Sequence, residues 1–327
     1  MDNLPFFQIS GDVRRAVSLG FPVVALESTV ITHGLPSPYN LSLARDMEAA
    51  VRDEGATPAT IGVLEGVVRV GLTDYELELL ANRPPSDNKR RMGELEEDYI
   101  RRITMKISRR DFAAAIAKKG SGGTTVAGTM FAADKAGIKV FATGGIGGVH
   151  RESNFDISPD MQALADTPMI VVCAGAKSIL NLPATLEYLE TMGVPVLGYN
   201  TDNFPAFFSR ESGLKTSAKA ETPQDVVNFA RAHWDLGMRS AVLVCNPLSK
   251  QDEIPNKQID PIEEQASKEA IEKKISGQEL TPFLLKRVNE LSGGKSMRAN
   301  LTLLLSNAHL AAQIAKIMPS PRKAKAI

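Results

Sequence analysis

The sequence predicts an α/β fold, with a mostly parallel twisted sheet flanked by helices and a helical C-terminal region. Short apolar runs with the composition of buried strands recur along the chain, and segments with helical spacing separate them. This alternation is typical of parallel strands joined by right-handed helical crossovers. Beyond Cys245 the patterns are helical. We therefore expect one domain over residues 1–327.

The N-terminal part begins with alternating strand and helix signals. Helices are marked by capping residues at their starts and by glycine at one end. The expected elements are a strand at 22–26 that ends at Glu27, a helix from Asn40 to Gly55, a strand at 59–64, and a helix from Thr73 through Leu80.

A charged segment interrupts this pattern at about residues 82–104. It contains two prolines, many charges of both signs and few apolar residues. Such a composition offers little to bury, so we expect a solvated, mobile surface insertion.

The alternation resumes after the insertion. Residues 120–123 are Gly-Ser-Gly-Gly and precede a helix, where exposed N–H groups can bind an anion. Ser158 followed by Pro159 is a strong helix start. The other expected elements are strands at 138–142, 169–173, 195–199 and 241–245, a helix from Ser108, and helices at 126–136, 184–192 and 223–236, with later helix caps at Thr281 and Ser296.

Bulk composition limits the class of partner. The chain has 38 basic and 38 acidic residues, which gives no electrostatic reason to expect nucleic acid or a membrane surface as a partner. Cys173 and Cys245 lie in apolar runs and are expected to be reduced core residues. No apolar run approaches the ~20 residues that span a bilayer, and the N-terminus lacks a signal-peptide core. We expect a cytoplasmic protein, with organellar targeting left open.

The stretch from Phe141 to Lys177 concentrates polar and glycine residues between two expected strands. Gly145 and Gly147 fit the first two glycines of a dinucleotide-binding motif, but His150 stands where the third should be. No Gly-Lys-Ser/Thr sequence follows the Gly120 run, which excludes a Walker loop. We interpret the glycine turn as backbone that approaches a small ligand closely.

Two acidic residues follow that turn. Asp156 and Asp160, with Ser158 between them, could supply hard oxygen ligands to one divalent cation. Alternatively, both acids decorate a helix N-terminus, which their charge would stabilise. His150 by itself is more typical of a hydrogen-bonding histidine than of a metal ligand.

Two strand-end residues indicate acid and amine chemistry. Glu27 directly follows one buried strand, and Lys177 follows another after Ala-Gly-Ala. Such a pair suggests acid catalysis combined with imine formation. Lys106 has a comparable position before a cap, and Arg109 and Arg110 could bind phosphate or be simple surface charge.

Several longer motifs carry a resemblance to a known family. They are VALEST at 24–29, PATI at 58–61, KISRRD at 106–111, TGGIGGVHR at 143–151, FDIS at 155–158, CAGAKSI at 173–179 and TPFLL at 281–285. On these motifs the chain, from about Ile9 to about Ala315, resembles the pseudouridine-5′-phosphate glycosidases.

The resemblance implies an activity and a set of roles. The activity is reversible cleavage of pseudouridine 5′-phosphate to uracil and ribose 5-phosphate, by a homotrimer that uses one manganese ion per subunit. A lysine imine with the ring-opened ribose would be the intermediate. The residues implied are Glu27 as proton donor, Lys177 as nucleophile, Asp156 as metal ligand, Lys106, Val126, Ser158, Pro159 and Asp160 as substrate contacts, and His150 and Asn300 in the base pocket.

Two other functions remain as alternatives. An imine-forming sugar-phosphate aldolase would use the lysine but need no base pocket. A non-catalytic nucleotide-binding protein would be favoured if Glu27 and Lys177 lay far apart. The charged segment is also longer than the corresponding part of the family pattern, and Pro159 stands where the family often has alanine.

Overall fold

The computed structural model describes residues 4–84, 92–151, 156–275, 277 and 280–318. Its strands form one sheet in the described part of the chain. They are β1 (Phe7–Ile9), β2 (Val23–Leu26), β3 (Thr57–Leu64), β4 (Val67–Val70), β5 (Met105–Ile107), β6 (Gly122–Thr124), β7 (Val140–Ala142), β8 (Ile170–Cys173), β9 (Val196–Tyr199), β10 (Ala218–Ala220) and β11 (Val242–Cys245).

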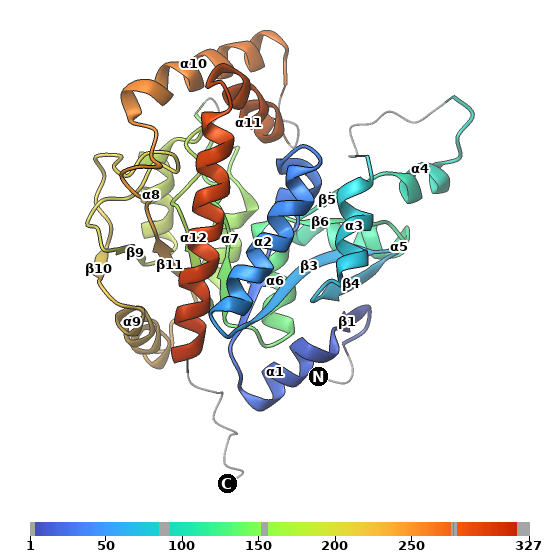
Figure 1. Cartoon of the computed structure of the whole chain (residues 1–327), viewed down its shortest axis with the longest axis horizontal. Helices are drawn as coiled ribbons and strands as arrows, with labels where there is room; N and C mark the ends of the chain where they lie inside the picture. The colour runs from blue at the N-terminus through green and yellow to red at the C-terminus, as the bar shows by residue number, and fades with distance from the viewer. Residues whose placement is uncertain (1–3, 85–91, 152–155, 276, 278–279, 319–327) are drawn as a thin grey trace.

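Helices connect and cover these strands (Figure 1). The α-helices are α1 (Gly11–Leu19), α2 (Tyr39–Asp53), α3 (Asp74–Asn82), α4 (Glu96–Arg102), α5 (Phe112–Ala117), α6 (Val126–Lys135), α7 (Pro159–Asp166), α8 (Leu182–Thr191), α9 (Pro223–Asp235), α10 (Asn256–Glu272), α11 (Leu280–Leu291) and α12 (Lys295–Ile317). Two short turns of helix, the π-helix η1 (Val30–Gly34) and the 3₁₀-helix η2 (Arg109–Asp111), follow β2 and β5.

The sheet order is β1-β4-β3-β2-β7-β8-β11-β9-β10, with β6 beside β3 and β5 beside β6. The pairs of β3 with β4 and with β6 are antiparallel, and the other strand pairs are parallel. The predicted α/β class, mostly parallel sheet and helical C-terminal region are confirmed. From β2 the chain first adds β3 on one side, and β7 later joins the other side. Open α/β sheets bind ligands where the order reverses in this way.

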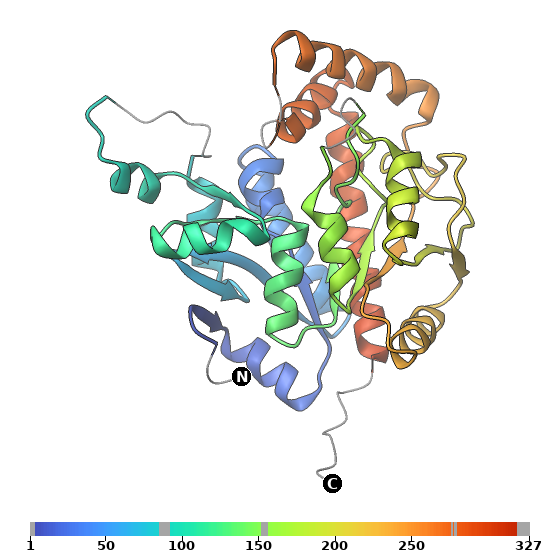
Figure 2. The ribbon, with the colours of Figure 1, turned by 180° about the vertical axis from the view of Figure 1, so that it is seen from behind.

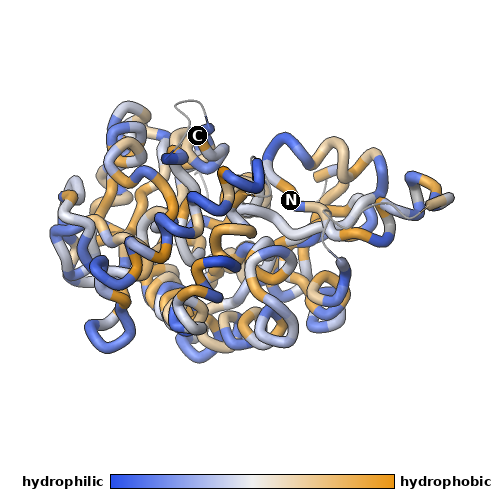
Figure 3. The backbone as a smooth tube through the Cα atoms, turned by 90° about the horizontal axis from the view of Figure 1, so that it is seen from above, coloured by the Kyte–Doolittle hydropathy of each residue, from blue (hydrophilic) through white to orange (hydrophobic). Residues whose placement is uncertain are grey.

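Helices lie on both faces of the sheet. The long helix α12 packs on β2, β7 and β8 and against α2 and α9, whereas α6 packs on the opposite face beside α7 (Figures 1 and 2). The central strands β2, β7, β8 and β11 are buried along their whole lengths. Seen from above, hydrophobic and hydrophilic segments alternate along the chain, as expected for helices with one buried face (Figure 3).

Several expected helix starts are confirmed by their hydrogen bonds. Thr73 and Glu76 form the capping box of α3, and the Ser158 hydroxyl accepts from the Asp160 N–H at the start of α7. Gly55, after α2, has the left-handed conformation with φ of 81°. Thr222, ahead of α9, forms a capping box with Asp225.

Three expected caps are wrong. Asn40 lies inside α2, where its amide donates to the carbonyls of Ile31 and Ala81 instead of capping the helix. Thr281 lies inside α11, which begins at Leu280. Ser296 is the second residue of α12, and its N–H donates to the hydroxyl of Ser292.

The strand β4 was not expected from the sequence. It forms a hairpin with β3 in which Leu64 faces Val67, so the connection is Glu65-Gly66. Both connecting residues have positive φ, 50° and 77°, as a two-residue type I′ hairpin requires. The acidic residue followed by glycine was therefore the signal for this turn.

The charged segment is not the fully solvated excursion expected from its composition. Its residues 85–91 lie outside the described part of the chain. The rest includes α4, where Ile100 is 8% exposed, and the adjoining Ile103 is 4% exposed. The Thr104 N–H donates to the Pro84 carbonyl at 2.7 Å, which closes the base of the segment. Two isoleucines among the charges are enough to dock its C-terminal part on the domain.

A candidate active site at the carboxyl ends of β2, β7 and β8

The register of the sheet brings an acid and a hydroxyl together. Leu26, the last residue of β2, pairs with Ala142, the last residue of β7. The next residue on each strand is Glu27 and Thr143, respectively, and the Thr143 hydroxyl donates a hydrogen bond to the Glu27 carboxylate. The Thr143 carbonyl accepts from the amide of Asn307 at 2.8 Å, which ties this position to α12.

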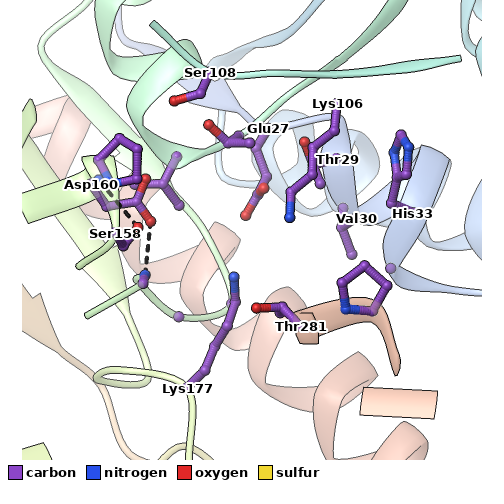
Figure 4. A pocket seen from close by; sticks show the side chains of 18 of the residues that line it. Glu27, Thr29, Val30, His33, Lys106, Ser108, Ser158, Asp160, Lys177 and Thr281 are labelled. Atoms are coloured by element: carbon purple, nitrogen blue, oxygen red, sulfur yellow. Dashed lines mark hydrogen bonds between the residues drawn. The ribbon is translucent and has the colours of Figure 1, made fainter. Parts of the chain in front are cut away.

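A cavity of about 380 Å³ opens at these strand ends. Helices α11 and α12 supply one wall, through residues such as Thr281 and Leu304. All ten residues expected from the sequence line it, namely Glu27, Lys106, Val126, His150, Asp156, Ser158, Pro159, Asp160, Lys177 and Asn300. In Figure 4 the amines of Lys106 and Lys177 reach the same space from opposite sides. Glu27 lines the same cavity as Lys177, whose charge acts on the Glu27 carboxyl group.

Glu27 is a buried carboxyl group with a perturbed pKa. Burial raises its pKa above the ordinary 4.5, and the negative charge of Asp160 adds to that effect. Lys177, the Thr143 hydroxyl and Lys106 act in the opposite direction, but burial is the largest effect. A raised pKa suits a group that delivers a proton.

Lys106 shares the cavity with Lys177 and is strongly perturbed. Burial, followed by the positive charge of Lys177, lowers the pKa of Lys106 to about 8. Asp160, Glu27 and Asp111 partly oppose this change. At physiological pH Lys106 is therefore mostly charged but gives up its proton more readily than a solvated lysine.

Asp160 connects three parts of the site. One carboxylate oxygen accepts from the Ala127 N–H at 2.9 Å and the other from the Gly147 N–H at 2.8 Å. Asp160 thus joins the start of α7 to the start of α6 and to the glycine turn. The structure supports the expectation that this acid sits at a helix N-terminus.

The start of α6 has three N–H groups near the site, and side chains accept from two of them. The N–H groups of Ala127 and Gly128 are bonded to the side chains of Asp160 and Thr125. Within the described residues no partner accepts from the Val126 N–H. Val126 lines the cavity, so the helix terminus has a donor for an anionic group there.

The glycine turn is shaped by packing against protein atoms. A Cβ on Gly147 would lie 2.2 Å from the Ser158 hydroxyl oxygen and 2.8 Å from a carboxylate oxygen of Asp160. On Gly145 it would lie 2.6 Å from the ring of Phe207. These glycines let the turn fit between α7 and Phe207 while it lines the cavity. Close approach of this backbone to a ligand stays a prediction.

Asp156 is the carboxylate in the cavity best suited to a hard cation. Asp160 already uses both oxygens on backbone N–H groups, and no cluster of three or more histidine, cysteine, aspartate or glutamate side chains suited to a metal occurs among the described residues. Burial lowers the pKa of His150 while Asp156 opposes the change, so the imidazole tends to be neutral.

Sequence analysis assigned no role to several residues of the site. His33 from η1, Thr281 from α11 and Phe207 from the loop after β9 line the cavity, and Thr143 contacts Glu27 without lining it. The π-helix that carries His33 directly follows the strand of Glu27, and such helices are frequent at functional sites. Thr143 is the first residue of the glycine-rich motif, but only the pairing of β2 with β7 shows that it contacts Glu27.

Other expected residues lie at the periphery. Arg109 donates to Asp166 at 2.9 Å on the surface, whereas Arg110 lines the cavity. Cys173 and Cys245 face each other in register on β8 and β11 as buried free thiols, as expected. No helix in the described part of the chain is long and apolar enough to cross a membrane.

Comparisons with known proteins agree with this architecture. A family model described as indigoidine synthase A like protein matches residues 12–317. A protein of Solibacter usitatus named pseudouridine-5′-phosphate glycosidase is 49% identical and covers 94% of this chain and 98% of its own. A protein of the same name from Petrotoga mobilis is 45% identical, with 97% and 98% covered.

Solved structures match equally far along the chain. The prealnumycin C-glycosynthase AlnA in complex with ribulose 5-phosphate has a TM-score of 0.83 at 38% identity, covering 97% of this chain and 98% of its own. An indigoidine synthase A-like protein from Thermotoga maritima has a TM-score of 0.82 at 32% identity, covering 96% and 98%. Matched over nearly its whole length in sequence and in fold, this chain belongs to the indigoidine synthase A like family, together with relatives named pseudouridine-5′-phosphate glycosidase.

Proposed function

We propose that the protein reversibly cleaves the carbon–carbon glycosidic bond of pseudouridine 5′-phosphate to give uracil and ribose 5-phosphate. The observation that carries the proposal is the meeting of Glu27 and Lys177 in one cavity, with a second amine, Lys106, opposite. The names of the relatives and the ribulose 5-phosphate bound to AlnA support the same substrate class.

The reaction needs an electron-pair donor attached to C1′, because uracil leaves through carbon and takes the bonding electrons with it. Ordinary glycosidases protonate a heteroatom leaving group, which does not help here. In our proposal the neutral amine of Lys177 adds to C1′ while Glu27 protonates the ring oxygen, so the C1′–O4′ bond breaks and the sugar opens. The raised pKa of Glu27 favours that proton transfer.

Cleavage follows from the open adduct. The nitrogen lone pair forms the C1′=N bond as the bond from C1′ to uracil breaks, and the uracil carbon takes a proton. The Lys177 nitrogen releases a proton after it has added to C1′, and this balances the proton that the uracil carbon takes. Water then hydrolyses the imine, which releases ribose 5-phosphate and regenerates the Lys177 amine.

The remaining cavity residues hold the substrate in this proposal. Lys106 supplies positive charge, and the Val126 N–H at the start of α6 supplies a donor to the anionic sugar phosphate. Ser158, Pro159 and Asp160 shape the neighbouring wall. His150 and Asn300 face the base, where a neutral imidazole and an amide can read the donors and acceptors of uracil.

A divalent cation, manganese by the resemblance, would be held by Asp156 and water. When bound, such an ion supplies positive charge to the phosphate-bearing substrate. Chelation is expected to stop uracil release without unfolding the protein, and Asp156→Ala should behave in the same way. Full activity of either preparation in chelator would disprove the metal requirement.

The central test is product identity. Protein incubated with pseudouridine 5′-phosphate and manganese should release free uracil, and the reverse mixture of uracil and ribose 5-phosphate should give the nucleotide. An aldolase would instead release a small aldehyde, and a binding protein would release nothing. Either outcome would reject the proposed reaction.

The covalent step has its own test. Borohydride added during turnover should reduce the imine and fix a ribose-phosphate mass on the peptide that contains Lys177. Lys177→Ala should show neither label nor uracil release, whereas Lys106→Ala should weaken binding and keep the label on Lys177. A label on Lys106 would exchange the roles of the two amines.

A further inference from the structure

Arg151 lies at the end of the glycine-rich motif and bonds to the turn that carries Lys177. Its guanidinium donates to the Ser178 carbonyl at 2.6 Å and to the Leu180 carbonyl at 3.2 Å. These acceptors are one and three residues beyond Lys177. The arginine thus fixes the backbone on the C-terminal side of the nucleophile.

The preceding segment holds the same turn from its other side. The Lys177 N–H donates to the Ile146 carbonyl at 3.1 Å, and the Asn181 N–H donates to the Val149 carbonyl at 2.9 Å. Several hydrogen bonds therefore hold the Lys177 turn against residues 146–151. The bonds from residues 177 and 181 join backbone groups, whereas Arg151 contributes its side chain. The orientation of that side chain can therefore alter the turn.

Glu263 orients that arginine from a distant part of the chain. It lies in α10, its side chain is 1% exposed, and one of its oxygens accepts from Arg151 at 3.1 Å. Burial raises the pKa of Glu263, while the positive charge of Arg151 lowers it. Burying a carboxylate costs desolvation free energy, and an ion pair often does no more than offset that cost. The Arg151–Glu263 contact is therefore better explained by a role in positioning than by a gain in stability.

The contact joins the cavity wall to the nucleophile. Helix α10 packs on α11, and α11 contributes Thr281, Pro282 and Leu285 to the cavity. In Figure 1 the two helices lie together at the top of the molecule, beside the N-terminal end of α12. The Arg151–Glu263 pair thus ties the α10–α11 wall to the turn of Lys177.

We propose that Glu263 and Arg151 are positioning residues that hold the Lys177 amine in the orientation needed to attack C1′. The proposal rests on the proposed function. Neither residue lines the cavity, so both act through the Lys177 turn. Small displacements of a reacting group are costly, because attack requires close contact and aligned orbitals.

The test measures imine formation in the full-length protein. Wild type is first shown to release uracil and to take the borohydride label on Lys177. With saturating ribose 5-phosphate, Glu263→Gln should then slow labelling roughly ten- to a hundredfold, as expected for a misplaced nucleophile. In the uracil-release assay its KM for pseudouridine 5′-phosphate should change little. Arg151→Lys should give the same result and serves if Glu263→Gln does not fold. The double variant should be no slower than either single one, because the pair acts as a unit.

Glu48→Gln is the matched control. Glu48 is also a buried helical carboxylate, 6% exposed, that accepts from an arginine, Arg52, at 2.8 Å, but it lies away from the cavity lining. It should label at the wild-type rate even if its melting temperature falls. Normal labelling of both Glu263→Gln and Arg151→Lys, or equal slowing in Glu48→Gln, would overturn the positioning role. Failure of wild type to release uracil would instead reject the proposed function.

Discussion

At the scale of single residues, Glu27 illustrates a conflict between stability and function. Its pKa in the folded chain is raised by burial, so folding disfavours the charged form. The stability that the protonated form provides is complete below the unfolded pKa of about 4.5 and is lost as pH rises through the folded pKa. At neutral pH the buried charge of Glu27 therefore lowers the stability of the fold. The protein tolerates this cost because the proposed catalytic role requires the carboxyl group.

Glu27→Gln should show both sides of this conflict. We expect a higher melting temperature than wild type at pH 7, with a smaller difference near pH 4, because the amide never carries the buried charge. Loss of the proton donor should reduce kcat for uracil release by about 10²- to 10⁴-fold. Melting curves at both pH values and a uracil assay measure these effects. A variant that is active, or less stable at pH 7, would contradict the assignment.

Lys106 gives a pH-dependent prediction. Its pKa of about 8 means that the free protein loses the Lys106 charge as pH rises through 8. If this ammonium binds the substrate phosphate, kcat/KM should fall above that pH, since kcat/KM reports groups of the free enzyme. Lys106→Arg keeps the charge and should remove this alkaline fall, whereas Lys106→Met should have low kcat/KM throughout. The same alkaline fall in Lys106→Met would assign it to another group.

At the scale of elements, α4 shows how much two apolar residues can alter a charged segment. Ile100 is buried at 8% exposure, whereas Met92 nearby in sequence is fully exposed. Ile100→Ala should lower the free energy of unfolding by about 2–5 kcal/mol, the usual cost of removing a buried isoleucine side chain. Met92→Ala is the control and should change it little. Urea denaturation measures both changes. If Ile100→Ala were as stable as wild type, the segment would be a solvated excursion after all.

The helices of the C-terminal part act as a wall of the site. The sequence identifies the helical character of residues 256–317 but not their position over the strand ends. Asn300, Leu304 and Thr281 reach the cavity because α11 and α12 meet there. Such contacts link residues far apart in sequence, which local periodicity does not encode.

At the scale of the whole molecule, we propose a homotrimer, with the family resemblance as its support. Light scattering should give about three times the chain mass of 35.3 kDa. The mass should remain constant over a wide dilution range if the assembly is stable. A mass equal to one chain would refute the trimer.

The sequence by itself determined the fold class and the positions of the central strands. Strands β2, β7, β8 and β11 were predictable because buried parallel strands are continuous apolar runs, and α7 because Ser158 and Pro159 form an explicit start signal. Sequence also identified ten residues that meet in one cavity, most of them through recognisable motifs. Their chemical roles remain predictions.

Only the tertiary structure decided which of these residues are neighbours. The pairing of β2 with β7 places Thr143 on Glu27, and the packing of α10 on α11 accompanies the contact of Glu263 with Arg151. It also moved Asn40 from a cap to a bridge between Ile31 and Ala81. The physical reason is that capping and periodicity are local properties, whereas strand order, burial and the resulting pKa of a side chain depend on contacts across the whole chain.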